Sequence, residues 1–222
     1  IGDVAMSLGA WEQYTTAPAA GLNKLDESAG IPLSLFLGAL GPTGLTAYFG
    51  LLDVGRPKAG ETVLVSAAAG AVGSVVGQIA KMQGCRVVGM AGTDDKCRWL
   101  TDELGFDAAI NYKTCGDYVA AIKQACPEGV DVYFDNVGGE ILDATLICLN
   151  KFARVAVCGW ISTYNVKNAP GPTNLWQLVA ESVTIQGFTV LDYMDRFGEG
   201  IGQLAQWLME GKLQYREEIV DG

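Results

Sequence analysis

Short apolar runs alternate with longer stretches of helical periodicity along most of the 222-residue chain. The runs are rich in β-branched residues, and glycine or polar turns separate them from the helical stretches. This order is typical of a parallel sheet flanked by helices. It predicts strands at 62–66, 86–90, 108–111, 130–135, 154–158 and 183–188, and helices from about 71 to 83, 94–105, 118–125, 140–149 and 197–210.

Six strands joined by helical crossovers predict an α/β fold with a doubly wound parallel sheet, the Rossmann arrangement. Before Gly60 the pattern differs. Residues 1–14 read as the end of a β-rich region, and Gly41-Pro42-Thr43-Gly44 begins a helix that leads into the sheet. We therefore place a domain boundary near Leu37, and we expect residues 162–174 to form a loop because they contain two prolines and a glycine.

A glycine-containing turn follows the first predicted strand directly. Its sequence AAAGAVG (67–73) places Ala68, Gly70 and Gly73 in the three glycine positions of the dinucleotide-binding fingerprint. Gly70 would let the backbone approach a pyrophosphate, and Gly73 would let the helix pack closely on the strand. The free N–H groups at the start of that helix favour phosphate binding.

The end of the second predicted strand indicates which dinucleotide is bound. NAD-dependent proteins usually carry an acid there for the ribose hydroxyls, whereas this chain has Ala91-Gly92-Thr93. Asp94 and Asp95 come later, where they suit the first turn of the next helix. Lys96 and Arg98 can supply positive charge for a 2′-phosphate, so we expect NADP(H); the alternative for Lys96 is a solvated helix lysine.

Composition narrows the possible partners and chemistry. The formal charge of −10 argues against a nucleic-acid surface, and no apolar run reaches the roughly 18 residues of a membrane span. Six scattered cysteines without a C-x-x-C pair favour reduced thiols and a cytoplasmic location. The sequence has no histidine, which excludes Ser-His-Asp and Cys-His catalysis within this segment and removes the commonest zinc ligand.

Five segments together resemble a known family: LGPTGLTAYFGLLDVG (40–55), VSAAAGAVGSVVGQIAKMQGCRVVGMAG (65–92), GFDAAINYKT (105–114), VYFDNVGGEILD (132–143) and CGWISTYN (158–165). They are similar to the zinc-independent branch of the medium-chain dehydrogenase/reductase superfamily that contains prostaglandin reductases and bacterial curcumin reductases. The resemblance implies NADPH-dependent reduction of the carbon–carbon double bond of an α,β-unsaturated ketone. It also implies a small-molecule enone as partner, no nucleic acid or membrane, and a homodimer.

The resemblance assigns site residues to each part of the cofactor. Tyr164 is also our candidate hydrogen-bond donor to the substrate carbonyl. For Tyr112, the alternative to a role at the adenosine is that it is a half-buried core tyrosine. The assigned residues are Ala68, Gly70, Ala71, Val72 and Gly73 near the pyrophosphate; Gly92, Thr93 and Lys96 near the 2′-phosphate; Tyr112 at the adenosine; Asn136, Cys158 and Gly159 toward the nicotinamide; and Ser162, Thr163 and Tyr164 in a mobile loop.

The resemblance also divides the chain into parts. Residues 1–36 would be the last stretch of a GroES-like β domain, 37–217 the Rossmann domain, and 218–222 the start of the return to the first domain. The start Ile1-Gly2-Asp3 looks like the middle of a longer protein. We therefore expect the other wall of the active-site cleft to be missing and this piece alone to be inactive.

Other functions are less compatible with the sequence. A short-chain dehydrogenase needs a Y-x-x-x-K pair, and Tyr14, Tyr112 and Tyr164 are followed four residues later by Pro, Gly and Asn. A zinc alcohol dehydrogenase needs a Cys/His set, and a methyltransferase an acid at the end of the second strand. A non-catalytic NADP(H)-binding module stays open as the alternative.

Overall fold

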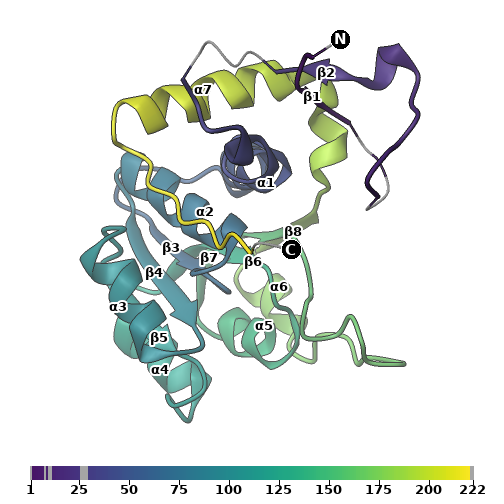
Figure 1. Ribbon diagram of the computed structural model, residues 1–222. Coiled ribbons are helices and arrows are strands. Elements are labelled where there is room, and N and C mark those ends of the chain that lie inside the picture. The colour runs from purple at the N-terminus through teal and green to yellow at the C-terminus, as the bar shows by residue number, and fades with distance from the viewer. Residues whose placement is uncertain (1, 8, 10–11, 26–29, 221–222) are drawn as a thin grey trace.

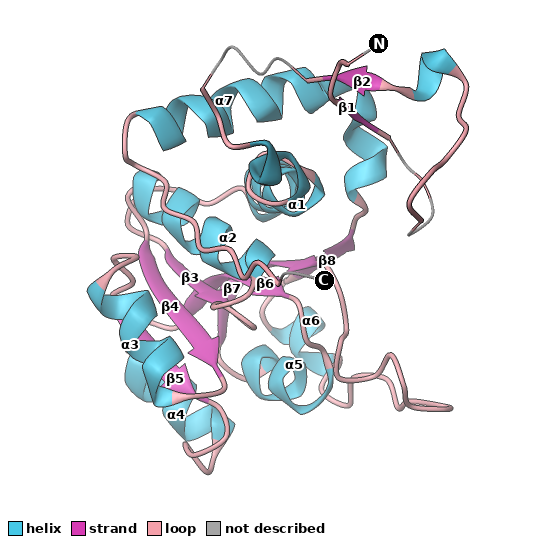
Figure 2. Ribbon diagram, viewed as in Figure 1, coloured by secondary structure: helices cyan, strands magenta, loops and turns pink. Residues whose placement is uncertain are grey.

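A six-stranded parallel sheet forms the centre of the protein, with helices on both of its faces (Figures 1 and 2). The structure is a computed structural model that describes all residues except 1, 8, 10–11, 26–29 and 221–222. The strands lie in the order β5-β4-β3-β6-β7-β8. Their bounds are β3 Thr62–Val65, β4 Arg86–Ala91, β5 Ala108–Asn111, β6 Val130–Asp135, β7 Leu149–Val157 and β8 Thr184–Gly187.

The strand order reverses beside β3, which makes the sheet doubly wound as predicted. From β3 the chain passes to β4 and β5 on one side, then crosses to β6 on the other side and continues to β7 and β8. Val65 of β3 is therefore paired with Gly89 of β4 and with Phe134 of β6. In open parallel sheets ligands bind at the carboxyl ends of the strands at such a reversal.

Two hydrophobic clusters fill the space between the sheet and its helices. The first lies under α1, α2 and α7 and also receives Leu100 of α3, and the second lies under α4 and α5 (Figure 1). The helices are α1 Pro42–Phe49, α2 Ala71–Met82, α3 Asp94–Asp102, α4 Tyr118–Ala125, α5 Gly139–Leu146, α6 Trp176–Ala180 and α7 Phe197–Met209, with 3-10 turns at Ala19–Gly21, Leu33–Leu37 and Val190–Arg196 and a π turn at Gly50–Gly55.

Most predicted elements are present, but three boundaries differ by three residues or more. The helix expected over 94–105 ends at Asp102. The helix expected over 140–149 ends at Leu146, and the strand expected at 154 already begins at Leu149. Leu149 pairs with Val130 of β6, so sheet pairing overrides the helical pattern of the apolar residues. The sequence also gave no signal for α6 or for the 3-10 turn at Val190–Arg196.

The N-terminal region contains little regular structure. Ala5–Met6 (β1) and Asn23–Lys24 (β2) form a small antiparallel pair, in keeping with the expected β-rich stretch. The assignment of residues 1–36 to a GroES-like domain stays a prediction. None of the helices within the described part of the chain has the length and hydrophobicity needed to cross a bilayer.

The C-terminal segment runs back along α2 (Figure 1). The buried Gln78 of α2 holds it with a pair of hydrogen bonds to one residue: Gln78 Nε2 donates to the carbonyl of Gln214, and Gln78 Oε1 accepts from its N–H at 2.9 and 2.7 Å. Leu213 beside it is buried in the first cluster. The segment after α7 is therefore fastened to α2.

Candidate functional site

The turn between β3 and α2 is built for close approach of the backbone to a ligand. Ala67 adopts a positive φ of 48°, and Ala68 is fully buried with its N–H donating to Met90 O at 2.9 Å. A Cβ on Gly73 would lie 2.5 Å from Ala67 O, so only glycine lets α2 pack this closely on the turn. Gly70 is the N-cap of α2.

The first turn of α2 leaves N–H groups without partners inside the helix. These are the amides of Ala71, Val72 and Gly73, and no side chain caps them. Together with the helix dipole they make a site that favours negative charge at the carboxyl end of β3. The turn therefore has the features expected of a pyrophosphate site.

A cavity of about 670 Å³ opens directly beside this turn. Its walls come from the turn after β3, the end of β4, the start of α5 and the loop after β7, with single residues from α3, from the segment after β5 and from α4. The lining residues are Ala67, Ala69, Gly70, Ala91, Gly92, Lys96, Tyr112, Tyr118, Val137, Gly138, Gly139, Glu140, Ile141, Ile161, Ser162, Thr163, Val166 and Pro170.

The cavity reaches the end of β4, where the selection of NADP(H) was predicted. Thr93 caps α3 by accepting the N–H of Lys96 at 3.3 Å, and Lys96 itself lines the cavity. The two acids are engaged elsewhere: Asp94 accepts the side-chain amide of Asn111, and Asp95 forms an ion pair with Arg98. This arrangement agrees with their predicted place in the first turn of α3.

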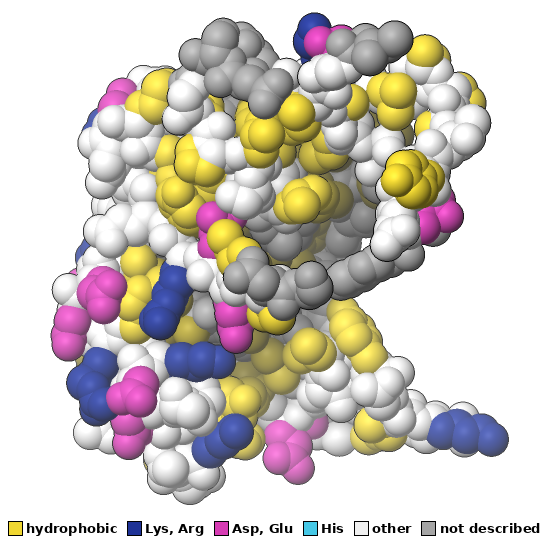
Figure 3. Space-filling model, in the orientation of Figure 1, with side chains coloured by type: hydrophobic (Ala, Val, Ile, Leu, Met, Phe, Trp, Pro, Cys, Tyr) yellow, Lys and Arg dark blue, Asp and Glu magenta, His cyan; other side chains and the backbone are white. Residues whose placement is uncertain are grey.

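Tyr112 lies against the end of β4. A Cβ on Gly92 would come within 2.8 Å of the Tyr112 hydroxyl, so the glycine gives the phenol room at the cavity wall. Lys and Arg side chains are scattered among acids over the region of α3 and α4, next to a recess lined by hydrophobic side chains (Figure 3). Tyr112 and Lys96 both line the cavity.

Asn136, which follows β6, lies differently from the prediction. Its side-chain nitrogen donates to Ser66 O at 2.7 Å, and its backbone N–H donates to Ser66 Oγ at 2.9 Å. The side chain thus joins β3 to β6 across the strand-order reversal and is absent from the cavity lining. Its Oδ1 and the second hydrogen of its Nδ2 are left to contact a cofactor.

The loop after β7 carries the remaining predicted residues. Ser162 and Thr163 line the cavity, and their hydroxyls donate to Val137 O and Trp160 O at 2.6 and 3.0 Å. Tyr164 exposes 67% of its surface, with its hydroxyl above Gly159, where a Cβ would lie 2.6 Å away. Tyr164 therefore lies outside the cavity wall, at its rim.

Cys158 and Gly159 follow the end of β7 and do not line the cavity. Both donate their N–H groups to Asp135 O, at 2.8 and 3.1 Å. Burial, and to a smaller extent the nearby carboxylate of Asp135, raise the pKa of the Cys158 thiol to about 11. The thiol is thus held in its neutral form at neutral pH.

Several lining residues were not predicted. Tyr118 and the start of α5 at Gly139-Glu140 face the same cavity as the predicted residues. A signal for the second of these exists in the sequence, since Val137-Gly138-Gly139 repeats the strand–glycine–helix order of the first turn. Asp135 and Trp160, which hold this edge together, gave no recognisable motif.

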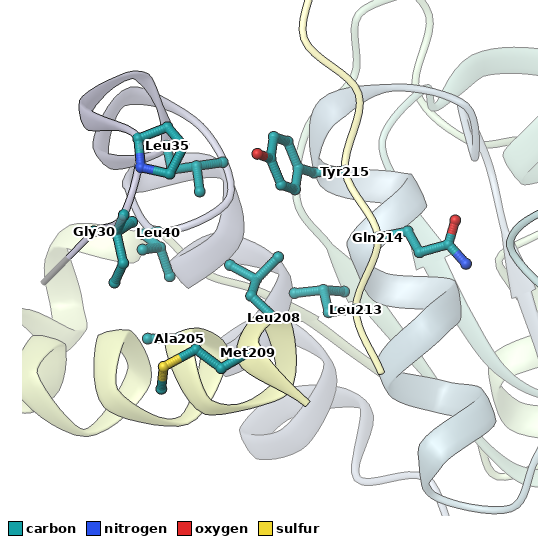
Figure 4. A pocket seen from close by; sticks show the side chains of 11 residues that line it. Gly30, Leu35, Leu40, Ala205, Leu208, Met209, Leu213, Gln214 and Tyr215 are labelled. Carbon is teal, nitrogen blue, oxygen red and sulfur yellow. The ribbon is translucent and has the colours of Figure 1, made fainter. Parts of the chain in front are cut away.

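A second cavity, of about 440 Å³, lies between the 3-10 turn Leu33–Leu37 and the end of α7 (Figure 4). Leu35, Leu40, Leu208 and Leu213 give it mainly apolar walls. None of the predicted cofactor residues lines it. Its chemistry does not suit a charged dinucleotide, and the 670 Å³ cavity is the candidate site.

Comparison with known proteins identifies the family. Residues 71–206, more than half of the chain, match the family described as "Zinc-binding dehydrogenase". The chain belongs to this family. The predicted resemblance to the medium-chain dehydrogenase/reductase superfamily is thereby confirmed. Among the described residues of this family member, no group of three or more His, Cys, Asp or Glu side chains could hold a metal ion.

Individual members of the family are similar over the whole chain. The chain is 45% identical over 227 residues to the NADPH-dependent curcumin reductase of Escherichia coli and 46% identical over 226 residues to prostaglandin reductase 1 of Bos taurus. All of the chain is covered in both cases, but it spans only 65% and 68% of the lengths of these relatives.

A solved structure is similar to the chain as well. The crystal structure of CurA in complex with NADPH from Vibrio vulnificus has a TM-score of 0.79 and 45% sequence identity. The match covers 84% of this chain and 57% of that chain.

Proposed function

We propose that the chain binds NADPH in the 670 Å³ cavity and belongs to an enzyme that reduces the carbon–carbon double bond of α,β-unsaturated ketones. The carrying observation is that one cavity joins the N-terminus of α2 to Lys96 at the end of β4. The helix end suits a pyrophosphate and the lysine a 2′-phosphate. Relatives named as NADPH-dependent curcumin reductase and prostaglandin reductase support the reaction class.

Different residues would bind different parts of NADPH. Gly70 and the amides of α2 would hold the pyrophosphate, Lys96 and Tyr112 the adenosine end, and Ser162 and Thr163 the nicotinamide end. When bound, NADPH supplies the hydride that the β-carbon of an enone accepts. As the β-carbon of the enone accepts the hydride, the carbonyl oxygen gains negative charge. A hydrogen-bond donor to this oxygen stabilises the charge and so lowers the activation free energy of the reduction.

Turnover of enones tests the proposal. We expect the full-length protein to oxidise NADPH with curcumin, with a 15-keto prostaglandin or with a simple enone such as 3-nonen-2-one. The matched control is 2-nonanone, which keeps the carbonyl but lacks the double bond and should give no oxidation above background. Binding of NADPH without turnover of any enone would favour the alternative, a non-catalytic NADP(H)-binding module.

Tyr164 is the proposed donor to the substrate oxygen. In the full-length protein we expect Tyr164→Phe to lower kcat with 3-nonen-2-one by about 10²-fold, the usual effect of removing one such donor. Affinity for NADPH should stay unchanged, because Tyr164 lies at the rim of the cavity and not in its lining. Steady-state kinetics gives both values, and an unchanged kcat removes Tyr164 from the mechanism.

We also propose a homodimer in the cytoplasm. β8 lies at an edge of the sheet, and Trp176 and Val179 of the preceding α6 expose 73% and 65% of their surfaces. An edge strand beside exposed apolar side chains favours pairing with a second copy. The free cysteines suit a reducing compartment. Sedimentation velocity of the full-length protein distinguishes a dimer from a monomer.

A further inference from the structure

The carboxylate of Asp135, the last residue of β6, is fully buried beneath the site. Its Oδ1 accepts the hydroxyl of Tyr133 at 2.8 Å and the N–H groups of Val137 and Gly138 at 3.1 and 2.9 Å. Its Oδ2 accepts the indole N–H of Trp160 at 3.0 Å. Burial raises the pKa of Asp135, and these donors oppose that effect by stabilising the carboxylate.

Two walls of the cavity meet at this carboxylate. One is the turn at Val137–Gly139, folded by the two backbone N–H groups that Oδ1 accepts. The other is the loop at 161–163, which follows Trp160 directly. Asp135 thus contacts the first wall directly and the second through Trp160, while itself remaining outside the cavity lining.

Trp160 connects the carboxylate to the loop. Its ring lies on Gly138, where a Cβ would be 2.6 Å from Cγ of the indole and where φ is 69°. Its carbonyl accepts both the N–H and the hydroxyl of Thr163, at 2.9 and 3.0 Å. Ser162 adds two further bonds from the loop to Val137 O. The position of the loop therefore depends on where the indole is fixed.

From this geometry we infer that Asp135 and Trp160 are positioning residues, which hold the loop at 161–163 against the turn at Val137–Gly139 and so shape the nicotinamide end of the cavity. The inference rests on the proposed function, since it assigns that end of the cavity to the nicotinamide. Neither residue lines the cavity, and both act through Ser162 and Thr163, which do.

Trp160→Phe tests the inference because it removes one hydrogen bond and keeps an aromatic ring on Gly138. The variant leaves Oδ2 of Asp135 without the indole donor, and an unpaired buried acceptor is costly. In the full-length protein we expect the Kd for NADPH to rise about tenfold, the size expected for such a loss. The Kd for 2′,5′-ADP, which has no nicotinamide, should change less than about twofold.

Asp135→Asn provides a second variant. The asparagine amide has the shape of the carboxylate but one oxygen becomes an NH₂, which would face either the indole N–H or the four donors on Oδ1, which include the Ser66 hydroxyl at 3.3 Å. We expect an effect on NADPH at least as large as that of Trp160→Phe. Should this variant fail to fold, Trp160→Phe alone decides.

The control is Trp207→Phe, in α7 and away from the cavity lining. It should leave the Kd values for NADPH and 2′,5′-ADP as in the wild type. Calorimetry measures the Kd values of both ligands. Of the two tryptophan variants, only Trp160→Phe should lower kcat with 3-nonen-2-one. Circular dichroism and thermal unfolding establish that each variant is folded.

Two results overturn the positioning role. One is an NADPH Kd and a kcat for Trp160→Phe within twofold of wild type; the other is equal weakening of NADPH and 2′,5′-ADP, which indicates a general structural loss. A wild-type protein that binds neither ligand overturns the proposed function instead, and the inference with it. The wild-type measurement therefore separates the two failures.

Discussion

Gly73→Ala is expected to lower the free energy of unfolding by about 3 kcal/mol or more, because the new methyl group has no space. It would lie 2.5 Å from Ala67 O and 2.8 Å from Ala68 Cα, and both are backbone atoms that cannot rotate away. Either α2 moves off the sheet or the turn opens. Urea unfolding followed by circular dichroism measures the loss.

Gly202→Ala is the matched control for this prediction. Gly202 also lies within a helix, α7, but its Cβ would meet nothing within 4 Å. Alanine there should raise the free energy of unfolding by about 0.5–1 kcal/mol, because glycine loses more backbone entropy on folding. The two substitutions should therefore have opposite signs. Equal effects would show that α2 does not depend on close contact at Gly73.

Lys96→Ala is expected to weaken binding of NADPH by about 10- to 100-fold, the range for losing a hydrogen bond between a cation and a phosphate. Binding of NADH should be nearly unchanged, because it lacks the 2′-phosphate. Calorimetry at one fixed ionic strength gives both Kd values and their ratio. The ratio of the two Kd values tests the role of Lys96, since a folding defect would weaken the binding of both nucleotides.

Arg98→Ala separates the two basic residues of α3. Arg98 forms an ion pair with Asp95 and does not line the cavity, whereas Lys96 does. We therefore expect Arg98→Ala to leave the preference for NADPH intact. A larger loss from Arg98→Ala than from Lys96→Ala would contradict the proposed selection of the 2′-phosphate.

The sequence predicted the sheet well where a strand and its turn signal stand alone. The strands at Ala108–Asn111 and Val130–Asp135 and the helix at Tyr118–Ala125 have the predicted bounds. It failed between Leu146 and Leu149, where an apolar run suits a helix and a buried strand equally. Pairing of Leu149 with Val130 makes the segment a strand. Such a long-range contact leaves no pattern in the local sequence.

The sequence likewise predicted one part of the candidate site and missed another. Gly70, Gly92, Lys96, Tyr112, Ser162 and Thr163 line one cavity, and the motifs after β3 and β4 together with the family resemblance predicted them. The positioning pair was not found, because Asp135 looks like an ordinary strand end and Trp160 like an isolated aromatic. Their relation exists only once β6 and β7 lie side by side.

Burial of three thiols has a consequence if the protein reduces enones as proposed. Such compounds are electrophiles that alkylate thiolates, whereas the protonated thiol reacts poorly. Burial raises the pKa of Cys85 and of Cys158 to about 11 and that of Cys126 to about 12. These three cysteines would stay protonated at neutral pH, so they would resist alkylation by the enones proposed as substrates.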